Sequence, residues 1–281
     1  MNRRVRTTSL LLAVVAGLVL TACSSSGGSN NAAESGAPAP TPTSATTIPD
    51  GSTAPAAPAL TGDLQVFAAA SLQETFTEIG NAIMATNPSL KITFNFASSG
   101  TLSQQIVSGA PADVFASANT KTMNNAAAVV GESTVFTHNS LVIVVPKGNP
   151  AGVKGLRDFT NANLKLALCD PSAPCGSAAQ KVFQNAGLTA APDTFGQDVT
   201  ATLNFVTAGE VDAAMVYRTD AIAAGDAVET ITFPEASGVI NDYPIAALKD
   251  RKNPAAAHAF IDYVLSPAGQ KVLTDAGFEA D

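Results

Sequence analysis

The chain has 281 residues, a formal net charge of −8 at pH 7, and a composition that is 46% hydrophobic and 14% charged. Its 23 acidic residues outnumber its 15 basic residues, which argues against a nucleic-acid partner and against long-range attraction of anions. The length allows one large domain or two smaller ones, with a sizeable buried core.

The first 22 residues are typical of a signal peptide. Three arginines lie among the first six residues, and an apolar stretch from Leu10 to Leu20 follows, too short to span a membrane comfortably. The run Leu20–Cys23 resembles a bacterial lipobox, in which Cys23 is lipidated and becomes the mature N-terminus. We therefore expect an exported protein, anchored by lipid to the outer face of the cell membrane. An ordinary signal peptide with an unmodified cysteine is the alternative.

Residues 23–61 consist mainly of Ser, Gly, Ala, Pro and Thr and have almost no large apolar side chains. Such a segment buries too little surface to offset the entropy lost on ordering. We interpret it as a disordered tether between the membrane and a globular body.

The globular body alternates between short β-rich runs and longer helical runs. The predicted strands are Leu64–Ala69, Lys91–Phe96, Asp113–Ala116, Leu141–Pro146, Leu164–Cys169, Ala213–Tyr217 and Thr230–Phe233. The predicted helices are Ser71–Ala85, Thr101–Ser108, Thr120–Val130, Gly176–Ala186, Thr200–Ala208 and Pro254–Leu265. This alternation predicts an α/β fold with a mostly parallel sheet and ligands at the carboxyl ends of its strands.

Two segments are candidate connections between lobes. Asn139–Pro146 is a candidate crossover into a second lobe, and the stretch from Phe233 to Ile245 is the candidate return. We therefore expect lobe 1 to comprise residues 62–139 and 238–281, lobe 2 to comprise residues 140–237, and a cleft to lie between them.

Four stretches place small or hydroxyl-bearing residues at helix starts: Phe67–Leu72, Ala97–Leu102, Cys169–Ser177 and Asp198–Leu203. The start of a helix presents unpaired N–H groups and the positive end of the helix dipole. Several such starts around one point would bind an anion without Lys or Arg.

Two serines are candidates for this site. Ser71 begins a capping-box pattern with Glu74, so its alternative role is to cap its own helix. Ser99 precedes Gly100, which allows a ligand to approach the backbone closely, although Ser99 could also be an ordinary cap.

Three other residues are candidates on the opposite lobe. Cys175 opens a helix after Pro174, and its N–H group would be free. Val199 follows Asp198, a good N-cap residue whose carboxylate we expect to bind its own backbone rather than a ligand. Tyr217 ends an apolar strand, where its hydroxyl is either a donor or a polar group at the edge of the core.

If Cys23 carries lipid, Cys169 and Cys175 remain as a pair. Export permits a disulfide between them, and two free thiols are the alternative.

The sequence lacks the common enzyme and metal motifs. It has no G-x-S-x-G, P-loop, G-x-G-x-x-G or H-E-x-x-H sequence, and its two histidines, His138 and His258, are far apart. We therefore expect no catalysis and no bound metal cation. A secreted serine hydrolase using Ser71 or Ser99 and a surface lipoprotein without a ligand are the alternatives from other classes.

Several motifs together resemble the periplasmic molybdate-binding proteins of ABC importers, over Asp63 to Phe278. They are Val66–Leu72, Phe96–Ser99, Gly109–Ala118, Asn139–Val142, Val216–Ala221 and Tyr243-Pro244. The resemblance implies a two-lobe periplasmic-binding-protein fold of type II with the ligand in the cleft. It also implies a monomer that binds molybdate or tungstate, needs no cofactor, and delivers the anion to an ABC importer permease.

The same resemblance implies the ligand set. Ser71, Ser99 and Tyr217 would donate hydroxyl groups, and Cys175 and Val199 would donate backbone N–H groups. The loop Asp170–Cys175 departs from the commonest family pattern, which makes the exact donor in that loop an open point. Another oxyanion, such as sulfate, is the alternative ligand.

Overall fold

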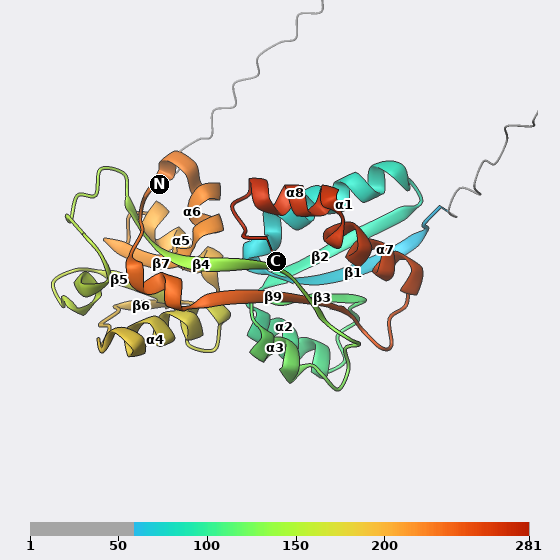
Figure 1. The fold of residues 1–281 in the computed structure, drawn as a ribbon, viewed down its shortest axis with the longest axis horizontal. Helices are drawn as coiled ribbons and strands as arrows, with labels where there is room; N and C mark the ends of the chain where they lie inside the picture. Colours follow the sequence, from blue (N-terminus) through green and yellow to red (C-terminus); the bar gives the residue numbers. More distant parts are fainter. Residues whose placement is uncertain (1–58, 281) are drawn as a thin grey trace, which may run out of the picture. The chain divides into compact units, whose positions relative to one another are not determined.

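The computed structural model describes residues 59–280 (Figure 1). The predicted signal peptide, the lipidation site Cys23 and nearly all of the predicted tether lie outside the described residues. The described residues belong to one compact unit. Among residues 59–280, no helix combines the length and the apolar character that crossing a membrane requires.

Nine strands within the described residues form one mixed sheet, in the order β2-β1-β3-β9-β4-β7-β5-β6, with β8 also pairing β4. The pairs β1–β2, β1–β3, β5–β6 and β5–β7 are parallel, whereas the pairs that β4 and β9 make are antiparallel. The strands are β1 Gly62–Ala69, β2 Leu90–Ala97, β3 Val114–Ala116, β4 Thr134–Pro146, β5 Leu166–Cys169, β6 Thr194–Gly196, β7 Ala213–Tyr217, β8 Val228–Ile231 and β9 Ile240–Ala247.

Strand β4 belongs to two parts of the sheet. Its residues from Thr134 to Ser140 pair with β9, whereas those from Leu141 onward pair with β7 and β8. The chain therefore passes between the two parts along β4 and returns along β9 (Figure 1). We keep the terms lobe 1 for residues 62–139 and 238–281 and lobe 2 for residues 140–237; these boundaries stay a prediction.

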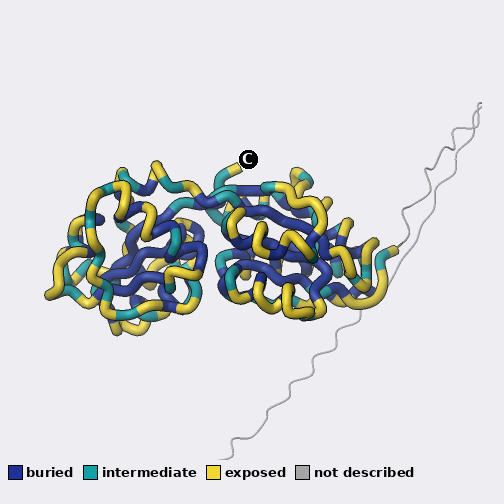
Figure 2. The backbone as a smooth tube through the Cα atoms, turned by 90° about the horizontal axis from the view of Figure 1, so that it is seen from below, coloured by how far each residue is buried: buried dark blue, intermediate teal, exposed yellow. Residues whose placement is uncertain are grey.

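Helices flank the strands of both parts. The α-helices are α1 Gln73–Thr86, α2 Ser99–Val107, α3 Thr120–Asn125, α4 Pro174–Ala186, α5 Val199–Thr207, α6 Arg218–Ala224, α7 Pro254–Leu265 and α8 Pro267–Asp275. Short 3₁₀ turns are η1 Ala70–Leu72, η2 Leu156–Thr160, η3 Gly225–Ala227 and η4 Pro234–Gly238. Burial is concentrated along the strands and the inner helix faces (Figure 2).

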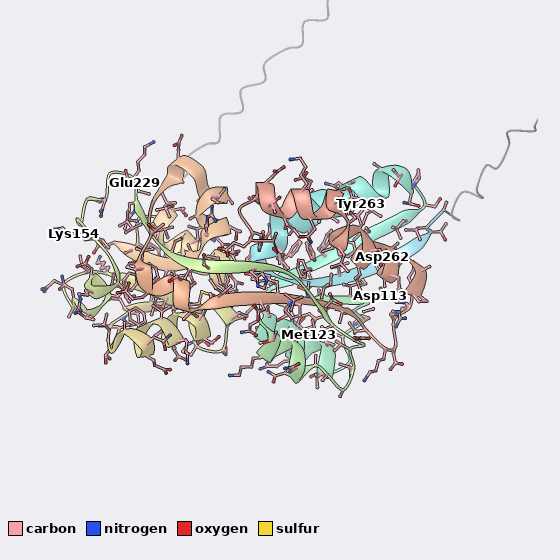
Figure 3. All side chains as sticks on the ribbon, viewed as in Figure 1. Asp113, Met123, Lys154, Glu229, Asp262 and Tyr263 are labelled. Carbon is pink, nitrogen blue, oxygen red and sulfur yellow. A yellow bond between two sulfur atoms is a disulfide. The ribbon has the colours of Figure 1, made fainter. Side chains whose placement is uncertain are left out.

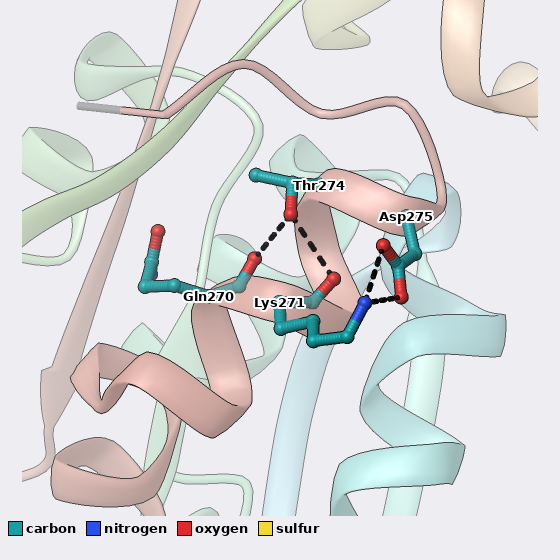
Figure 4. Close-up of polar contacts among 4 residues, drawn as sticks. All are labelled: Gln270, Lys271, Thr274 and Asp275. Carbon is teal, nitrogen blue, oxygen red and sulfur yellow. Dashed lines mark hydrogen bonds and ion pairs between the residues drawn. The ribbon is translucent and has the colours of Figure 1, made fainter.

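Aromatic packing joins the elements of lobe 1. Phe76 of α1 lies 5.8 Å from the ring of Phe136 in β4 and 5.3 Å from that of Phe260 in α7, centroid to centroid. Helix α8 is fixed to β4 because the side chain of Gln270 donates to the carbonyl of Phe136. The exposed side of α8 carries the pair Lys271–Asp275 at 2.7 Å, and the Thr274 hydroxyl donates to helix carbonyls (Figure 4).

Asp113 explains part of the Gly109–Ala118 motif. Its buried carboxylate accepts from the N–H groups of Gln65, Lys252 and Asn253, at 2.8, 2.6 and 3.2 Å. The side chain lies at one end of the first part of the sheet (Figure 3). Asp113 thus connects β1 to the segment that leads into α7, which is a structural role.

The elements differ from the predicted ones at several places. Strand β4 begins at Thr134 instead of Leu141, and α3 ends at Asn125 instead of Val130. Strands β6 and β9 and helices α6 and α8 were not predicted. Pro244 disfavoured a strand, since proline cannot donate to a ladder, but in β9 it pairs with Val135 where a bulge shifts the register.

Candidate functional site

A small cavity of about 10 Å³ is lined by all five predicted ligand residues: Ser71, Ser99, Cys175, Val199 and Tyr217. They come from η1, the starts of α2, α4 and α5, and the end of β7. Among the described residues, no Lys or Arg lines this cavity. The sequence positions that looked like separate helix starts are thus neighbours in space.

Ser99 is the first residue of α2 and is only 1% exposed. Neither Ser99 nor the N-cap residue Ser98 caps the helix with its side chain; the Ser99 hydroxyl instead accepts from the N–H of Ala118 at 3.0 Å. Because the oxygen accepts from a backbone donor, its proton is left for another acceptor.

Ser71 does not cap a helix either. The turn η1 spans Ala70–Leu72, and α1 begins at Gln73 with Leu72 as N-cap and no side-chain cap. The capping-box interpretation of Ser71 and Glu74 is therefore wrong, because a 3₁₀ turn moves the helix start by two residues. The Ser71 hydroxyl lies 2.9 Å from the hydroxyl of Tyr243.

Cys175 lies in the first turn of α4. Ala173 is the N-cap and Pro174 is the first helical residue, and the N–H of Ser177 makes the bond to the carbonyl of Ala173. The N–H of Cys175 comes two residues earlier and has no intrahelical acceptor. Cys169 and Cys175 are joined by a disulfide, with their Cα atoms 5.8 Å apart.

Val199 is the first residue of α5, and its N–H likewise lacks an intrahelical acceptor. The N-cap residue Asp198 accepts from the N–H of Ala201 at 2.8 Å. This confirms the expectation that the Asp198 carboxylate binds its own backbone.

Tyr217 ends β7 and is 1% exposed. Its hydroxyl accepts from the side-chain amide of Asn241 at 2.9 Å. Burial, together with the nearby Tyr243 and Asp220, raises the pKa of Tyr217 well above its usual value. The hydroxyl therefore keeps its proton and is a donor at physiological pH.

Sequence reasoning missed two buried asparagines behind the cavity. Asn139 in β4 and Asn241 in β9 are register partners where the chain passes between the two parts of the sheet. In the sequence each lies beside other polar residues of its strand, His138 and Ser140 for Asn139 and Asp242 for Asn241, so no local pattern singled them out. A buried amide requires hydrogen-bond partners, so such a residue marks a polar network.

Asp220 is a buried carboxyl on α6, three residues after Tyr217. One of its oxygens, Oδ2, has no partner among the described residues. Burial, the largest cause, and the charges of Asp198 and Glu74 together raise its pKa to about 8. Asp220 is therefore mostly protonated at neutral pH, which limits its repulsion of an anion nearby.

The histidines lie in other settings. His138 contacts the carboxylate of Asp242 at 2.9 Å, and the ring of His258 lies 2.9 Å from the guanidinium of Arg251. Neither histidine lines the cavity, so the serines there have no histidine base beside them. Within residues 59–280, no group of three or more His, Cys, Asp or Glu could hold a metal ion. The arrangement of hydroxyl and N–H donors suits an anion.

Three comparisons place the chain among known proteins. The family described as "Bacterial extracellular solute-binding protein" matches residues 64–279. The molybdate-binding protein ModA of Mycobacterium tuberculosis is 42% identical over 216 residues, which cover 76% of this chain and 83% of that protein.

Two solved structures share the fold. The periplasmic molybdate-binding protein of Azotobacter vinelandii has a TM-score of 0.67 and 20% identity, over 78% of this chain and 99% of that one. The sulfate-binding protein SubI of M. tuberculosis has a TM-score of 0.68 and 17% identity, over 78% of this chain and 86% of that one. The two-lobe periplasmic-binding-protein fold predicted from the sequence is thus confirmed.

Proposed function

Because the chain belongs to the bacterial extracellular solute-binding proteins, we propose that it captures molybdate outside the cytoplasm and delivers it to the permease of an ABC importer. The observation that carries this proposal is the cavity where Ser71, Ser99, Cys175, Val199 and Tyr217 meet. The ModA relative at 42% identity supports molybdate as the ligand.

In this proposal the anion is held by neutral donors alone. Ser71, Ser99 and Tyr217 each donate an O–H, and Cys175 and Val199 each donate a backbone N–H. A hydrogen bond to a charged acceptor contributes about 1.5–3 kcal/mol net. Five or more such bonds support sub-micromolar binding after the cost of ordering the two lobes around the ligand.

Sulfate is the alternative ligand, favoured by the likeness of the fold to SubI. Sulfate and molybdate share charge and shape, so an all-donor site separates them by cavity size alone. Tungstate is close to molybdate in chemistry, and we propose that it binds as well. Identity to ModA, much higher than that to SubI, favours molybdate over sulfate.

We also propose that the protein acts as a monomer held at the outer face of the membrane by lipid on Cys23, with residues 23–61 as a tether. The sequence pattern around Cys23 supports this part of the proposal. A binding role needs no cofactor and no catalysis, in keeping with the family.

Thermal melting of residues 61–281 with molybdate, tungstate, sulfate and phosphate tests the ligand. A ligand that binds only the folded state raises the melting temperature by mass action. We expect large shifts with molybdate and tungstate and a far smaller one with sulfate at equal concentration. Equal shifts with sulfate and molybdate would contradict the molybdate assignment, and no shift with any oxyanion would contradict the binding role.

A further inference from the structure

The hydroxyl groups at the cavity are backed by hydrogen-bond donors. A hydroxyl has one proton, and its oxygen can accept as well as donate. Whether it donates to a ligand or accepts from one therefore depends on what already occupies its oxygen. The groups behind Ser71, Ser99 and Tyr217 decide this.

Asn241 determines the role of Tyr217. The same side-chain nitrogen of Asn241 lies 2.8 Å from the carbonyl oxygen of Ala118 and 2.9 Å from the hydroxyl of Tyr217. A carbonyl can only accept, so the atom facing it must be the NH₂ group, and this fixes the orientation of the amide. The Tyr217 oxygen therefore accepts from Asn241 and must give its own proton to another group.

Two acceptors are available to the proton of Tyr217. One is the hydroxyl of Tyr243, whose ring centroid lies 6.0 Å from that of Tyr217. The other is an anion in the cavity that Tyr217 lines. A doubly charged oxyanion is a stronger acceptor than a neutral hydroxyl, so Tyr217 donates to the ligand when the cavity is filled.

The hydrogen-bonding role of Ser99 is determined by Ala118, the residue whose carbonyl oxygen also contacts Asn241. The N–H of Ala118 donates to the Ser99 hydroxyl, and the carbonyl of Ala118 accepts from Asn241. An N–H can only donate, so Ser99 accepts from it and its proton is free for the ligand. Ala118 thus connects the donor Ser99 of lobe 1, through Asn241, to the donor Tyr217 of lobe 2.

Asn139 acts on Ser71 through Tyr243. The N–H of Ser140 donates to the side-chain oxygen of Asn139, which fixes this amide as well. Its NH₂ group then donates to Thr219 at 2.8 Å and to the Tyr243 hydroxyl at 3.4 Å. The hydroxyls of Tyr243 and Ser71 share a hydrogen bond; we infer that Tyr243, which accepts from Asn139, is its donor, which leaves Ser71 to donate into the cavity.

We propose that Asn139 and Asn241 are specificity-determining positioning residues, which fix Ser71, Ser99 and Tyr217 as donors so that only fully deprotonated oxyanions fit. This inference rests on the proposed binding function and explains its selectivity. Hydrogen phosphate carries a proton that needs an acceptor, and leaving that proton unpaired in a buried site is costly. Asp198, the carboxylate at the cavity wall, is engaged as an N-cap.

The test compares affinities for molybdate and for hydrogen phosphate at pH 8 by calorimetry. Asn241→Leu removes the donor behind Tyr217 without adding charge, so the tyrosine oxygen can accept from a protonated ligand. We expect molybdate affinity to change by less than about tenfold, while the ratio of molybdate to phosphate affinity falls by at least about tenfold. Asn204→Leu, at an exposed position of α5, is the matched control and should leave the ratio unchanged.

A second variant reverses the direction of the hydrogen bond between residue 241 and Tyr217. In Asn241→Asp the carboxylate accepts from Tyr217, so the cavity loses a donor and molybdate binds more than about tenfold more weakly. The added charge would weaken binding too, and a double-mutant cycle separates the two effects. In a Tyr217→Phe background the further loss caused by Asn241→Asp should be severalfold smaller than in the unmodified protein.

The outcomes distinguish the inference from the proposed function. Unmodified protein that binds molybdate, with an unchanged selectivity ratio in Asn241→Leu and equal losses from Asn241→Asp in both backgrounds, would overturn the inference alone. Unmodified protein that binds no oxyanion would overturn both. Melting curves without ligand show whether each variant is folded, and if one variant does not fold, the result of the other decides.

Discussion

At the scale of single residues, Ser71 and Ser99 are serines at helix starts that cap no helix. Their hydroxyls contact groups from other segments, Tyr243 and Ala118, and both line the same cavity. A capping hydroxyl accepts from an N–H of its own helix, whereas the Ser99 hydroxyl accepts from Ala118 and the Ser71 hydroxyl contacts Tyr243. The residue type and position of these serines predicted a polar role. Only their tertiary contacts distinguish a serine that caps a helix from one that can donate to a ligand.

Ser99→Ala tests this role directly. The change removes one donor to a buried charged acceptor, so molybdate binding should weaken by about 1–3 kcal/mol. Thr101→Ala, an exposed position on the same helix, is the matched control and should leave affinity unchanged. Calorimetric titration measures both. Ser71→Ala should behave like Ser99→Ala without loss of a helix cap, and unchanged affinity in both serine variants would remove them from the site.

Tyr217→Phe deletes one hydroxyl and keeps the packing of the ring. If Tyr217 donates only when the lobes close on the anion, the variant should release molybdate faster while the association rate changes little. Stopped-flow kinetics separates the two rates. A dissociation rate equal to that of the parent would show that Tyr217 belongs to the core edge only.

The raised pKa of Asp220 predicts that the stability of the protein depends on pH. Its pKa is about 8 in the folded protein, against 3.8 for the ordinary carboxyl. The folded state thus binds more protons than the unfolded state between these values. The contribution to stability is complete below about pH 4 and is lost as the pH rises through 8, by at most about 1.4 kcal/mol per pH unit.

The isosteric change Asp220→Asn removes this titration. We expect it to raise the melting temperature more at pH 8.5 than at pH 5, where the native carboxyl is already protonated. Melting curves at both pH values, without ligand, measure the difference. A parallel pH profile for the variant and the parent would mean that Asp220 is ionised in both states.

The sequence located the five cavity residues but missed Asn139, Asn241 and Tyr243 as their support. The first group lies at strand-to-helix transitions, a local feature that a sequence displays. The second group depends on the pairing of β4 with β9, two segments about a hundred residues apart. Long-range register of this kind cannot be recognised from the local sequence.

At the scale of elements, the disulfide loop from Cys169 to Cys175 contacts the start of α2. The carbonyl oxygen of Ser172 would lie 2.9 Å from a Cβ atom added to Gly100. Such a distance to a backbone atom forces a movement of one of the two segments. The loop belongs to lobe 2 and α2 to lobe 1, so the small size of Gly100 permits their approach.

Gly100→Ala should therefore act in opposite directions on the free and the bound protein. Without ligand, alanine in the first turn of α2 should stabilise the helix by about 0.4–1 kcal/mol. With molybdate, the added methyl group should hinder closure, and affinity should fall by tenfold or more. Gly238→Ala, where nothing lies within 4 Å of the added Cβ, is the control. An unchanged affinity for Gly100→Ala would show that the contact does not matter for binding.

The elements that the sequence predicted well are those with a clear hydrophobic period and clear ends. Strand β7 and helix α7 have the predicted bounds, and Pro254 begins α7 as its first helical residue. Strand β9 was hidden by Pro244, and β6, with three residues, is too short for a pattern. Tertiary pairing rather than local preference forms these strands.

At the scale of the whole molecule, the proposed anion site belongs to an acidic protein. Beyond Cys23, 12 basic residues face 23 acidic residues. The pocket that shares Ala70 and Ser71 with the cavity is lined by Glu74 and by Asp220, of which Asp220 is mostly protonated at neutral pH. The long-range field therefore repels a dianion, and the affinity must come from short-range donors at the cavity itself.

This charge distribution predicts an unusual salt dependence of binding. Where opposite charges attract, added salt slows association; here the field is repulsive, so screening should speed it. We expect the association rate of molybdate to rise as NaCl is increased from about 0.01 M to about 0.15 M, where the Debye length falls from about 30 Å to about 8 Å. Glu74→Gln should raise the rate at low salt and reduce its salt dependence, because Glu74 is an exposed acidic residue that lines the neighbouring pocket. Glu132→Gln removes the same charge at an exposed position outside both pockets and serves as the control. Stopped-flow association rates that fall with salt would show that local positive potential at the helix starts outweighs the net charge even at long range.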